Sequence, residues 1–309
     1  MKNVMPDIAR NTVADSIKID EVGMTDMEVV VSVESPSLGM MRLPGKADAL
    51  ISLNRPEIKG IHMSRVYLAI QDALNNSPIS FKLIEQCLHN FLVSHSNLSE
   101  TASLWVGFEL PIMRSSLKSS LQGWRFYPVQ FMGKIRNGEV RLKKRVRVAY
   151  SSTCPCSAAL ARQLIQNEFR ERFPHSDVKS AEVYEWLGSE SGICATPHGQ
   201  RSYATITVVP RQDSLAADSV VLIDTIEAAL GTPVQSAVKR EDEQEFARLN
   251  GENAMFVEDS VRKIAIALES LEGVEDYLIE SSHQESLHPH NAVATQSKGI
   301  QGGMKSVFY

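Results

Sequence analysis

Two cysteines separated by a single proline, Cys154-Pro155-Cys156, are the residues of this sequence best suited to chemistry. Thiols one residue apart are poorly placed to bond to each other, so they suit two tasks, one as a metal ligand and one against a substrate. A strand running through this segment into a helix would place Cys156 near a helix N-terminus, where backbone N–H groups favour a thiolate. The spacing alone leaves open a plainer interpretation, two small buried side chains at a strand end.

A second group of titratable residues lies near the C-terminus, where Glu285, His288 and His290 follow one another closely, beside His283. Residues two apart in an extended segment point to the same side, so His288 and His290 can face one pocket. A carboxylate beside two imidazoles can move protons. Together with the cysteines, this cluster favours metal-assisted hydrolysis; the alternative is a polar surface loop.

Four further segments carry candidate groups. His198 lies between Pro197 and Gly199 in a loop, and Glu258 lies in the first turn of a helix expected to begin near Phe256. Basic groups open another expected helix and can form an anion site or simply cap the helix. The run from Lys239 to Glu243 is typical of a solvated face. The basic groups of the expected anion site are Lys59, His62 and Arg65.

Composition narrows the class of protein. The chain has 309 residues, 43% hydrophobic and 22% charged, with a net charge of -5, which disfavours a general nucleic-acid binder. The segment 1–15 has no apolar core of a secretory signal, and no uninterrupted apolar run is long enough to span a membrane. Four cysteines without an export signal predict reduced thiols and a cytoplasmic location.

The hydrophobic pattern predicts an α+β protein with two halves of similar order, a duplicated unit by pattern although no residue-level repeat is visible. The segment 1–24 is polar and weakly patterned and is interpreted as a loose arm. Asn137-Gly138 predicts a hairpin. The expected strands are 27–34, 102–113, 124–135, 141–151, 203–209 and 277–282, and the expected helices are 62–76, 81–94, 157–173, 218–230, closing at Gly231, and 256–271.

Six segments occur here in the order found in one known family, and the sequence resembles the prokaryotic type IB GTP cyclohydrolase I family over roughly residues 20–293. No one segment is decisive, whereas the ordered set is specific. The segments are Lys59-Gly60-Ile61-His62-Met63-Ser64-Arg65, Cys154-Pro155-Cys156-Ser157, His198-Gly199-Gln200-Arg201-Ser202, Lys239-Arg240 with Glu243, Phe256-Val257-Glu258-Asp259 and Glu285-Ser286-Leu287-His288-Pro289-His290.

The resemblance implies the tunnelling fold (T-fold), in which antiparallel strands carry paired helices on one face, with two such modules per chain. It places the first module at 25–138 and the second at 139–309, with an insertion around 174–196. It also implies a homotetramer with active sites at subunit interfaces. Neither nucleic acid nor membrane is an expected partner.

The resemblance further implies an enzyme, a hydrolase that opens the imidazole ring of GTP, releases formate and forms 7,8-dihydroneopterin triphosphate. This product feeds folate biosynthesis and, in some organisms, modified tRNA bases. A divalent metal, zinc, manganese or iron, would be held by Cys154, His198 and Glu243, with His288 nearby. Such a mixed ligand set does not choose between these metals.

The same resemblance assigns the remaining roles. The metal would activate water for addition to C8 of guanine. Cys156 would lie against the reacting carbon, and Glu258 would accept hydrogen bonds from guanine N1–H and the 2-amino group. Glu285, with His288 or His290, would shuttle protons. The triphosphate would contact Lys59, His62 and Arg65.

The sequence departs from the family in one interval. His198 lies 44 residues after Cys154, and the polar segment 173–195, which we expect to be irregular, must loop out if the two are to meet. His175 and Cys194 are weaker substitutes as ligands. The tail 298–309 has no assigned role.

Three other interpretations compete with this one. An NADPH-dependent tunnelling-fold nitrile reductase should carry a Glu-Ser-Lys-rich motif, and the nearest stretch, Arg114-Ser115-Ser116-Leu117-Lys118, lacks the glutamate. A non-catalytic metal-binding or thiol-switch protein would bind metal without consuming GTP. The least specific interpretation is a two-domain α+β protein with scattered polar loops.

Overall fold

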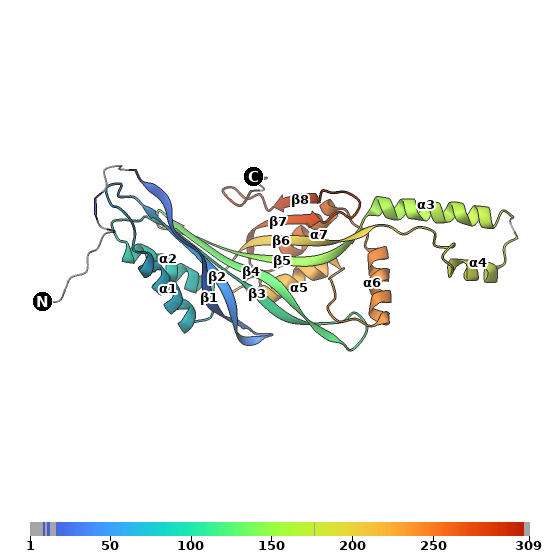
Figure 1. The fold of residues 1–309 in the computed structure, drawn as a ribbon, viewed down its shortest axis with the longest axis horizontal. Helices are drawn as coiled ribbons and strands as arrows, with labels where there is room; N and C mark the ends of the chain where they lie inside the picture. Colours follow the sequence, from blue (N-terminus) through green and yellow to red (C-terminus); the bar gives the residue numbers. More distant parts are fainter. Residues whose placement is uncertain (1–8, 10, 13–16, 176, 306–309) are drawn as a thin grey trace.

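The computed structural model describes residues 9, 11–12, 17–175 and 177–305. The strands of these residues form one eight-stranded antiparallel sheet in sequence order (Figure 1). The strands are β1 (Ile19–Ser35), β2 (Gly39–Leu53), β3 (Thr101–Ser115), β4 (Gln122–Arg136), β5 (Glu139–Thr153), β6 (Gly199–Pro210), β7 (Val274–His283) and β8 (Ala292–Ser297).

Two pairs of helices pack on this sheet. The helices α1 (Met63–Asn76) and α2 (Phe81–Ser94) contact β1, β3 and β4, whereas α5 (Ser219–Leu230) and α7 (Val257–Ser270) contact β5, β7 and β8. Figure 1 shows the pairs along the sheet, one at each half. Two modules of antiparallel strands and a helix pair therefore make up the chain, as the α+β tunnelling fold requires.

The apolar periodicity explains which faces are buried. From Met27 to the end of β1 every second residue is buried, with Val29, Val31 and Val33 turned toward the helices. On α1 the buried residues Val66, Ile70 and Leu74 repeat at helical spacing. Alternation in strands and a single apolar stripe on helices produce one core between the sheet and its helices.

Local signals set several element ends. Ser80 caps α2 by accepting a hydrogen bond from Leu83 N at 3.1 Å, and Asp218 caps α5 by accepting from Val220 N at 2.7 Å. The helix α5 ends at Gly231, whose φ of 75° suits a left-handed C-cap. The predicted hairpin at Asn137-Gly138 is confirmed by positive φ at both residues.

Two sequence expectations about irregular segments were wrong. Part of 173–195 is helical: α3 (Pro155–Arg172) leads to α4 (Ser180–Leu187), whose Trp186 packs against Phe169 and Phe173 with ring centroids 5.6 and 5.7 Å apart. The expected arm 1–24 overlaps β1, which begins at Ile19. Its first three residues are exposed, whereas Val22 and Met24 are half-buried against the core, and the backbone pairs with β2.

Four elements had no sequence prediction: β2, β8, α4 and α6 (Arg240–Glu252). A short 3-10 helix, η2 (Leu215–Ala217), precedes α5. The described part of the C-terminal tail is anchored, because Met304 N donates to the buried Asp276 Oδ2 at 2.6 Å.

The two modules share a continuous sheet, since β4 pairs with β5 from Val129↔Val146 to Arg136↔Glu139. A buried ionic cluster joins them on the helical side. Arg125 on β4 pairs with Glu227 on α5 at 2.7 Å, and Tyr127 OH donates to the same carboxylate at 2.8 Å. The boundary near residue 138 therefore separates two modules of similar element order, and the sheet is continuous across it.

Candidate functional site

Cys154 and His198 are neighbours despite the long interval between them. Cys154 N donates to His198 O at 3.3 Å, and the adjoining residues Thr153 and Gly199 are partners in the β5–β6 ladder. The helices α3 and α4 project away from the sheet as an excursion between these points (Figure 1). The loop-out that the sequence required is therefore present, and it favours His198 over the exposed His175 and Cys194 as the partner of Cys154.

The Cys-Pro-Cys segment opens α3, as the sequence predicted. Cys154 is the N-cap, Pro155 is the first helical residue, and Cys156 follows within the first turn, exposed to solvent. Ser157 Oγ accepts a hydrogen bond from His198 N at 3.1 Å, which ties the loop before β6 to this turn. Two thiols at one helix N-terminus thus differ in exposure, consistent with different tasks.

His198 has a defined ring contact. Its Nδ1 lies 3.1 Å from Gln200 Oε1, and an amide oxygen only accepts hydrogen bonds. When Nδ1 is the donor in this contact, Nε2 keeps the lone pair that a metal would need.

The end of α6 and the connection to α7 contact the same end of β5. Met255 N donates to Thr153 O at 3.0 Å, and Asn250 Oδ1 accepts from Ser151 Oγ at 2.7 Å. Glu243 is seven residues before Asn250, so it lies on the same face of α6, about 10 Å away along the helix axis. Glu258 is exposed in the first turn of α7, as predicted.

The loop after β7 reaches this end as well. Gln284 N donates to Arg201 O at 3.2 Å, which holds the start of the loop beside β6. Glu285 is half-buried, and His288 and His290 are exposed with their rings stacked 5.0 Å apart. The two imidazoles therefore lie on one side of the chain, although residues 286–290 form bends and not the extended segment that the spacing argument assumed.

A buried histidine, His283, lies near this end of the sheet. His283 Nε2 lies 2.9 Å from Tyr150 OH. Burial lowers the pKa of His283 to about 4, against the opposing influence of Glu258 and Asp259, and burial raises the pKa of Tyr150. His283 is thus neutral at pH 7 and serves as a packed hydrogen-bonding residue.

The basic group of the first module lies at the opposite end of the sheet. Lys59 follows β2, whose end pairs with the start of β1, whereas Cys154 follows β5. A strand of 15 residues such as β5 spans about 50 Å. Arg65 donates to Ser94 O at 2.9 Å, and His62 N donates to His95 Nε2 at 3.2 Å. One chain therefore does not bring Lys59, His62 and Arg65 to the cysteines.

The donor types suit a divalent transition metal: a thiol, an imidazole and a carboxylate. Two of the three predicted ligands, Cys154 and His198, lie side by side. Within the residues that the structure describes, no group of three His, Cys, Asp or Glu side chains is gathered closely enough to hold a metal. The donor types of the pair fit the metal, and Glu243 as the third ligand stays a prediction.

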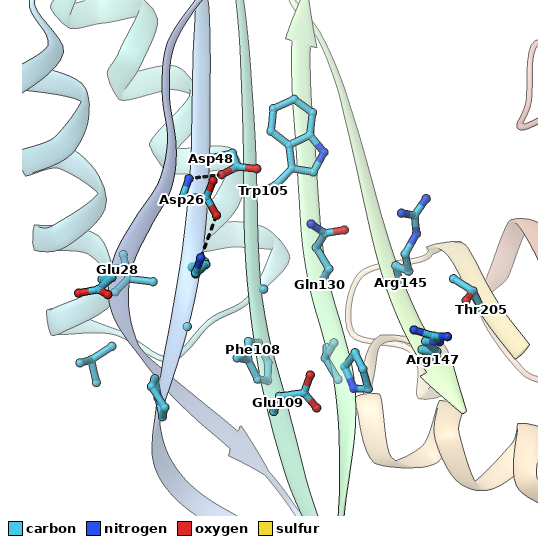
Figure 2. A pocket seen from close by; sticks show the side chains of 18 of the residues that line it. Asp26, Glu28, Asp48, Trp105, Phe108, Glu109, Gln130, Arg145, Arg147 and Thr205 are labelled. Atoms are coloured by element: carbon cyan, nitrogen blue, oxygen red, sulfur yellow. Dashed lines mark hydrogen bonds and ion pairs between the residues drawn. The ribbon is translucent and has the colours of Figure 1, made fainter. Parts of the chain in front are cut away.

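A large cavity of about 1150 Å³ lies elsewhere, on the sheet face away from the helices. Figure 2 shows acidic side chains from β1 to β3, including Asp26, Asp48 and Glu109, facing Arg145 and Arg147 across the sheet. None of the residues predicted for chemistry is among those that line it. Its position makes it a feature of the open sheet surface, separate from the cysteine end.

Sequence reasoning missed two residues here. Asp242 is fully buried, although it lies in a run interpreted as a solvated face, and Asn250 fixes α6 to β5. The spacing of Asn250 from Glu243 is a signal for the second. For the first, the local signal is an acidic residue at the third position of α6, where it accepts from Lys239 N.

Comparison with solved structures identifies the fold class. The uricase from Bacillus fastidious is similar in structure, with a TM-score of 0.51, 10% sequence identity and coverage of 90% of this chain and 92% of that chain. Urate oxidase from Bacillus sp. TB-90 gives the same TM-score and identity, over 90% of this chain and 98% of that one. At this identity the likeness concerns the fold alone, and the chain is a tunnelling-fold protein.

Sequence comparison is more specific. The family model for type I GTP cyclohydrolase FolE2 matches residues 5–294. GTP cyclohydrolase FolE2 of Pseudoalteromonas translucida is 46% identical over 98% of this chain and 100% of that protein, and that of Hydrogenovibrio crunogenus is 46% identical over 97% and 96%. The chain belongs to the type I GTP cyclohydrolase FolE2 family, an enzyme family and not that of the nitrile reductases. In the described part of the chain, no helix is long and apolar enough to cross a membrane.

Proposed function

We propose that this chain hydrolyses GTP, opening the imidazole ring of guanine to give formate and 7,8-dihydroneopterin triphosphate, the first step of folate and pterin biosynthesis. The observation that carries the proposal is the contact between Cys154 and His198 at the sheet end that also holds Glu258 and the loop 284–291. Membership of the FolE2 family supports the substrate.

Zinc, manganese or iron would be held by Cys154 and His198, with Glu243 as the third ligand. When bound, the metal supplies a Lewis acid that activates water for attack on C8 of guanine. Cys156, exposed at the N-terminus of α3, would lie against the reacting carbon and assist proton transfer.

The remaining residues would bind the base and move protons. The exposed carboxylate of Glu258 accepts two hydrogen bonds readily and matches N1–H and the 2-amino group of guanine. Glu285 with His288 or His290 would carry protons during ring opening and release of formate. His283 is unsuited to this work, since it is buried and hydrogen-bonded to Tyr150.

We further propose that the active enzyme is a cytoplasmic homotetramer with sites between subunits. Lys59, His62 and Arg65 lie at the far end of the sheet from Cys154, and a second copy could bring its own set to the triphosphate. The local basic charge would attract the polyanion although the chain is acidic overall.

The first test is turnover by metal-stripped protein resupplied with Mn²⁺, Zn²⁺ or, without oxygen, Fe²⁺. Formate release and, after oxidation, neopterin fluorescence should return with at least one ion. Cys154→Ala should lose metal and activity, and Cys156→Ala should keep metal but lose activity. Cys194→Ala, which removes another exposed thiol, is the matched control and should behave as wild type. No formate from folded, metal-loaded protein would refute the proposal.

The shared site has its own test. Arg65→Ala combined with Lys59→Ala inactivates one set of groups, and Cys154→Ala inactivates the other. If each site draws on two copies, mixed oligomers of the two inactive variants should regain turnover. No recovery in verified mixed oligomers would show that one copy supplies both sets.

A further inference from the structure

A chain of hydrogen bonds runs from His198 into the sheet. His198 Nδ1 lies 3.1 Å from Gln200 Oε1, Gln200 Nε2 donates to Ser152 Oγ at 3.0 Å, and Ser152 Oγ lies 2.7 Å from Ser202 Oγ. Both serines are fully buried. The chain therefore begins at a half-exposed ring and ends inside the molecule.

The strand register explains why these side chains meet. Gln200 on β6 is the ladder partner of Ser152 on β5. Side chains of directly opposite residues lie on the same face of an antiparallel pair. The amide of Gln200 is thereby held on a rigid strand, and His198 lies two residues before it on the same chain.

The backbone of His198 is fixed independently. Its N–H donates to Ser157 Oγ at 3.1 Å, and its carbonyl accepts from Cys154 N at 3.3 Å. With the backbone held, the ring can still rotate about its own bonds. The Gln200 contact supplies the missing restraint, and in the described part of the chain Nε2 makes no hydrogen bond of its own.

We propose that Gln200 is a positioning residue that fixes both the orientation and the tautomer of His198, with Ser152 holding the amide, so that Nε2 is presented to the metal beside Cys154. The inference rests on the proposed metal site and adds a residue that touches neither metal nor substrate. A hydrogen bond from the second ring nitrogen of a metal-binding histidine to an acceptor sets its tautomer, and losing such a partner typically weakens metal binding about 10–100-fold.

The test measures metal affinity, not turnover. Metal-free wild type, Gln200→Met and Gln200→Glu are titrated with Co²⁺, whose visible and near-ultraviolet bands report a sulfur ligand and the coordination geometry, and then with Zn²⁺ in competition. Methionine keeps the length of the side chain and removes the acceptor, whereas glutamate restores it. Gln163→Met, at an exposed position on α3, is the matched control.

The inference predicts an order of metal affinities among the variants. Gln200→Met should bind about 10–100-fold more weakly with altered bands, Gln200→Glu should bind within a few-fold of wild type, and Gln163→Met should be unchanged. Wild-type affinity in Gln200→Met overturns the inference, and so does an equal loss in Gln200→Met and Gln200→Glu, because that would show a packing role only.

Three further outcomes are distinguishable. If Gln200→Met does not fold, Ser152→Ala frees the amide while leaving it in place and should weaken binding; wild-type affinity there overturns the inference. If wild type binds metal through Cys154 but releases no formate from GTP, the proposed function fails while the order of affinities stands. If wild type binds no metal, or binds metal in a way that Cys154→Ala does not abolish, the proposed metal site and the inference are both refuted.

Discussion

Two fully buried ionisable side chains lie in contrasting surroundings. Lys144 on β5 is buried where the two helix pairs meet, with its amine donating to Ala217 O and lying 4.5 Å from the centre of the Phe131 ring. Asp242, in the first turn of α6, is surrounded by donors. It accepts hydrogen bonds from Lys118 N, Ser119 N and Lys239 N at 2.7–2.8 Å and from Ser119 Oγ at 2.6 Å.

The same burial has opposite consequences. Burial lowers the pKa of Lys144 to about 7, with only partial opposition from Asp218. Burial also works against the ionised form of Asp242, but the hydrogen bonds from Lys239, Ser119 and Lys118 prevail and hold its pKa well below the usual range. Burial thus neutralises an ionisable group unless enough hydrogen-bond partners are built around its charged form.

Arg125 is a third buried charge, and Glu227 is its ionic partner. Glu227→Ala would leave Arg125, which is 8% exposed, without its carboxylate at 2.7 Å, and would also remove the contacts of that carboxylate with Arg114 and Tyr127. We expect the free energy of unfolding to fall by about 3–5 kcal/mol, the usual cost of an unpaired buried charge. Urea unfolding at fixed protein concentration measures it. A loss below about 1 kcal/mol would mean that Arg125 is solvated on relaxation.

Lys144→Met removes the charge that burial disfavours. The folded pKa of about 7 lies below the usual lysine value of 10.5, which applies in the unfolded chain. The unfolded state therefore binds more protons between these two values, and stability rises with pH. From pH 7 to pH 9 wild type should gain about 2 kcal/mol relative to Lys144→Met. Urea unfolding of both proteins at each pH gives the difference, and a difference that is constant with pH would show that Lys144 stays charged.

Asp242→Asn should act locally. Asparagine keeps the shape but loses the charge and one acceptor, so the β3–β4 turn should detach more easily from α6. Amide hydrogen exchange at Lys118, Ser119 and Lys239 should speed up about tenfold or more, while amides of α2 remain unchanged. Unchanged exchange at these three amides would show that the turn does not depend on the carboxylate.

The smallest effect on stability is expected for a solvent-exposed ion pair. Arg211 pairs with Glu272 at 2.8 Å, but both side chains are more than half exposed. Arg211→Ala should change the free energy of unfolding by less than about 1 kcal/mol. Urea unfolding under the conditions used for Glu227→Ala provides the comparison, and a loss as large as in that variant would remove the distinction between buried and exposed pairs.

The fold was predictable where the pattern was strong. The helices α1, α2, α5 and α7 carry a clear apolar stripe, and β4 and β5 are joined by an Asn-Gly turn, so their existence followed from local chemistry. In contrast, β8 and α4 are short, and α6 is mostly charged. These elements exist because of tertiary partners, such as the aromatic contacts of Trp186.

The candidate site shows the same division. The residue types for metal binding and proton transfer could be read from the ordered segments, and the structure brings Cys154 and His198 together across the α3–α4 excursion. The assignment of Glu243 as the third ligand stays a prediction. The role inferred for Gln200 depends on its ladder partner Ser152, which no local sequence pattern reveals.

The sequence by itself determined the family, the chemical groups and the strongly periodic elements, because these depend on residue types and short spacings. Only the tertiary structure decided which of those groups meet. Strand pairing places the end of β5 beside the start of β6 and leaves Lys59 at the far end of the sheet. It also decided that Asp242 is buried and satisfied while Lys144 is buried with few partners. Neither burial nor partner number is a local property, because both depend on segments distant in the chain.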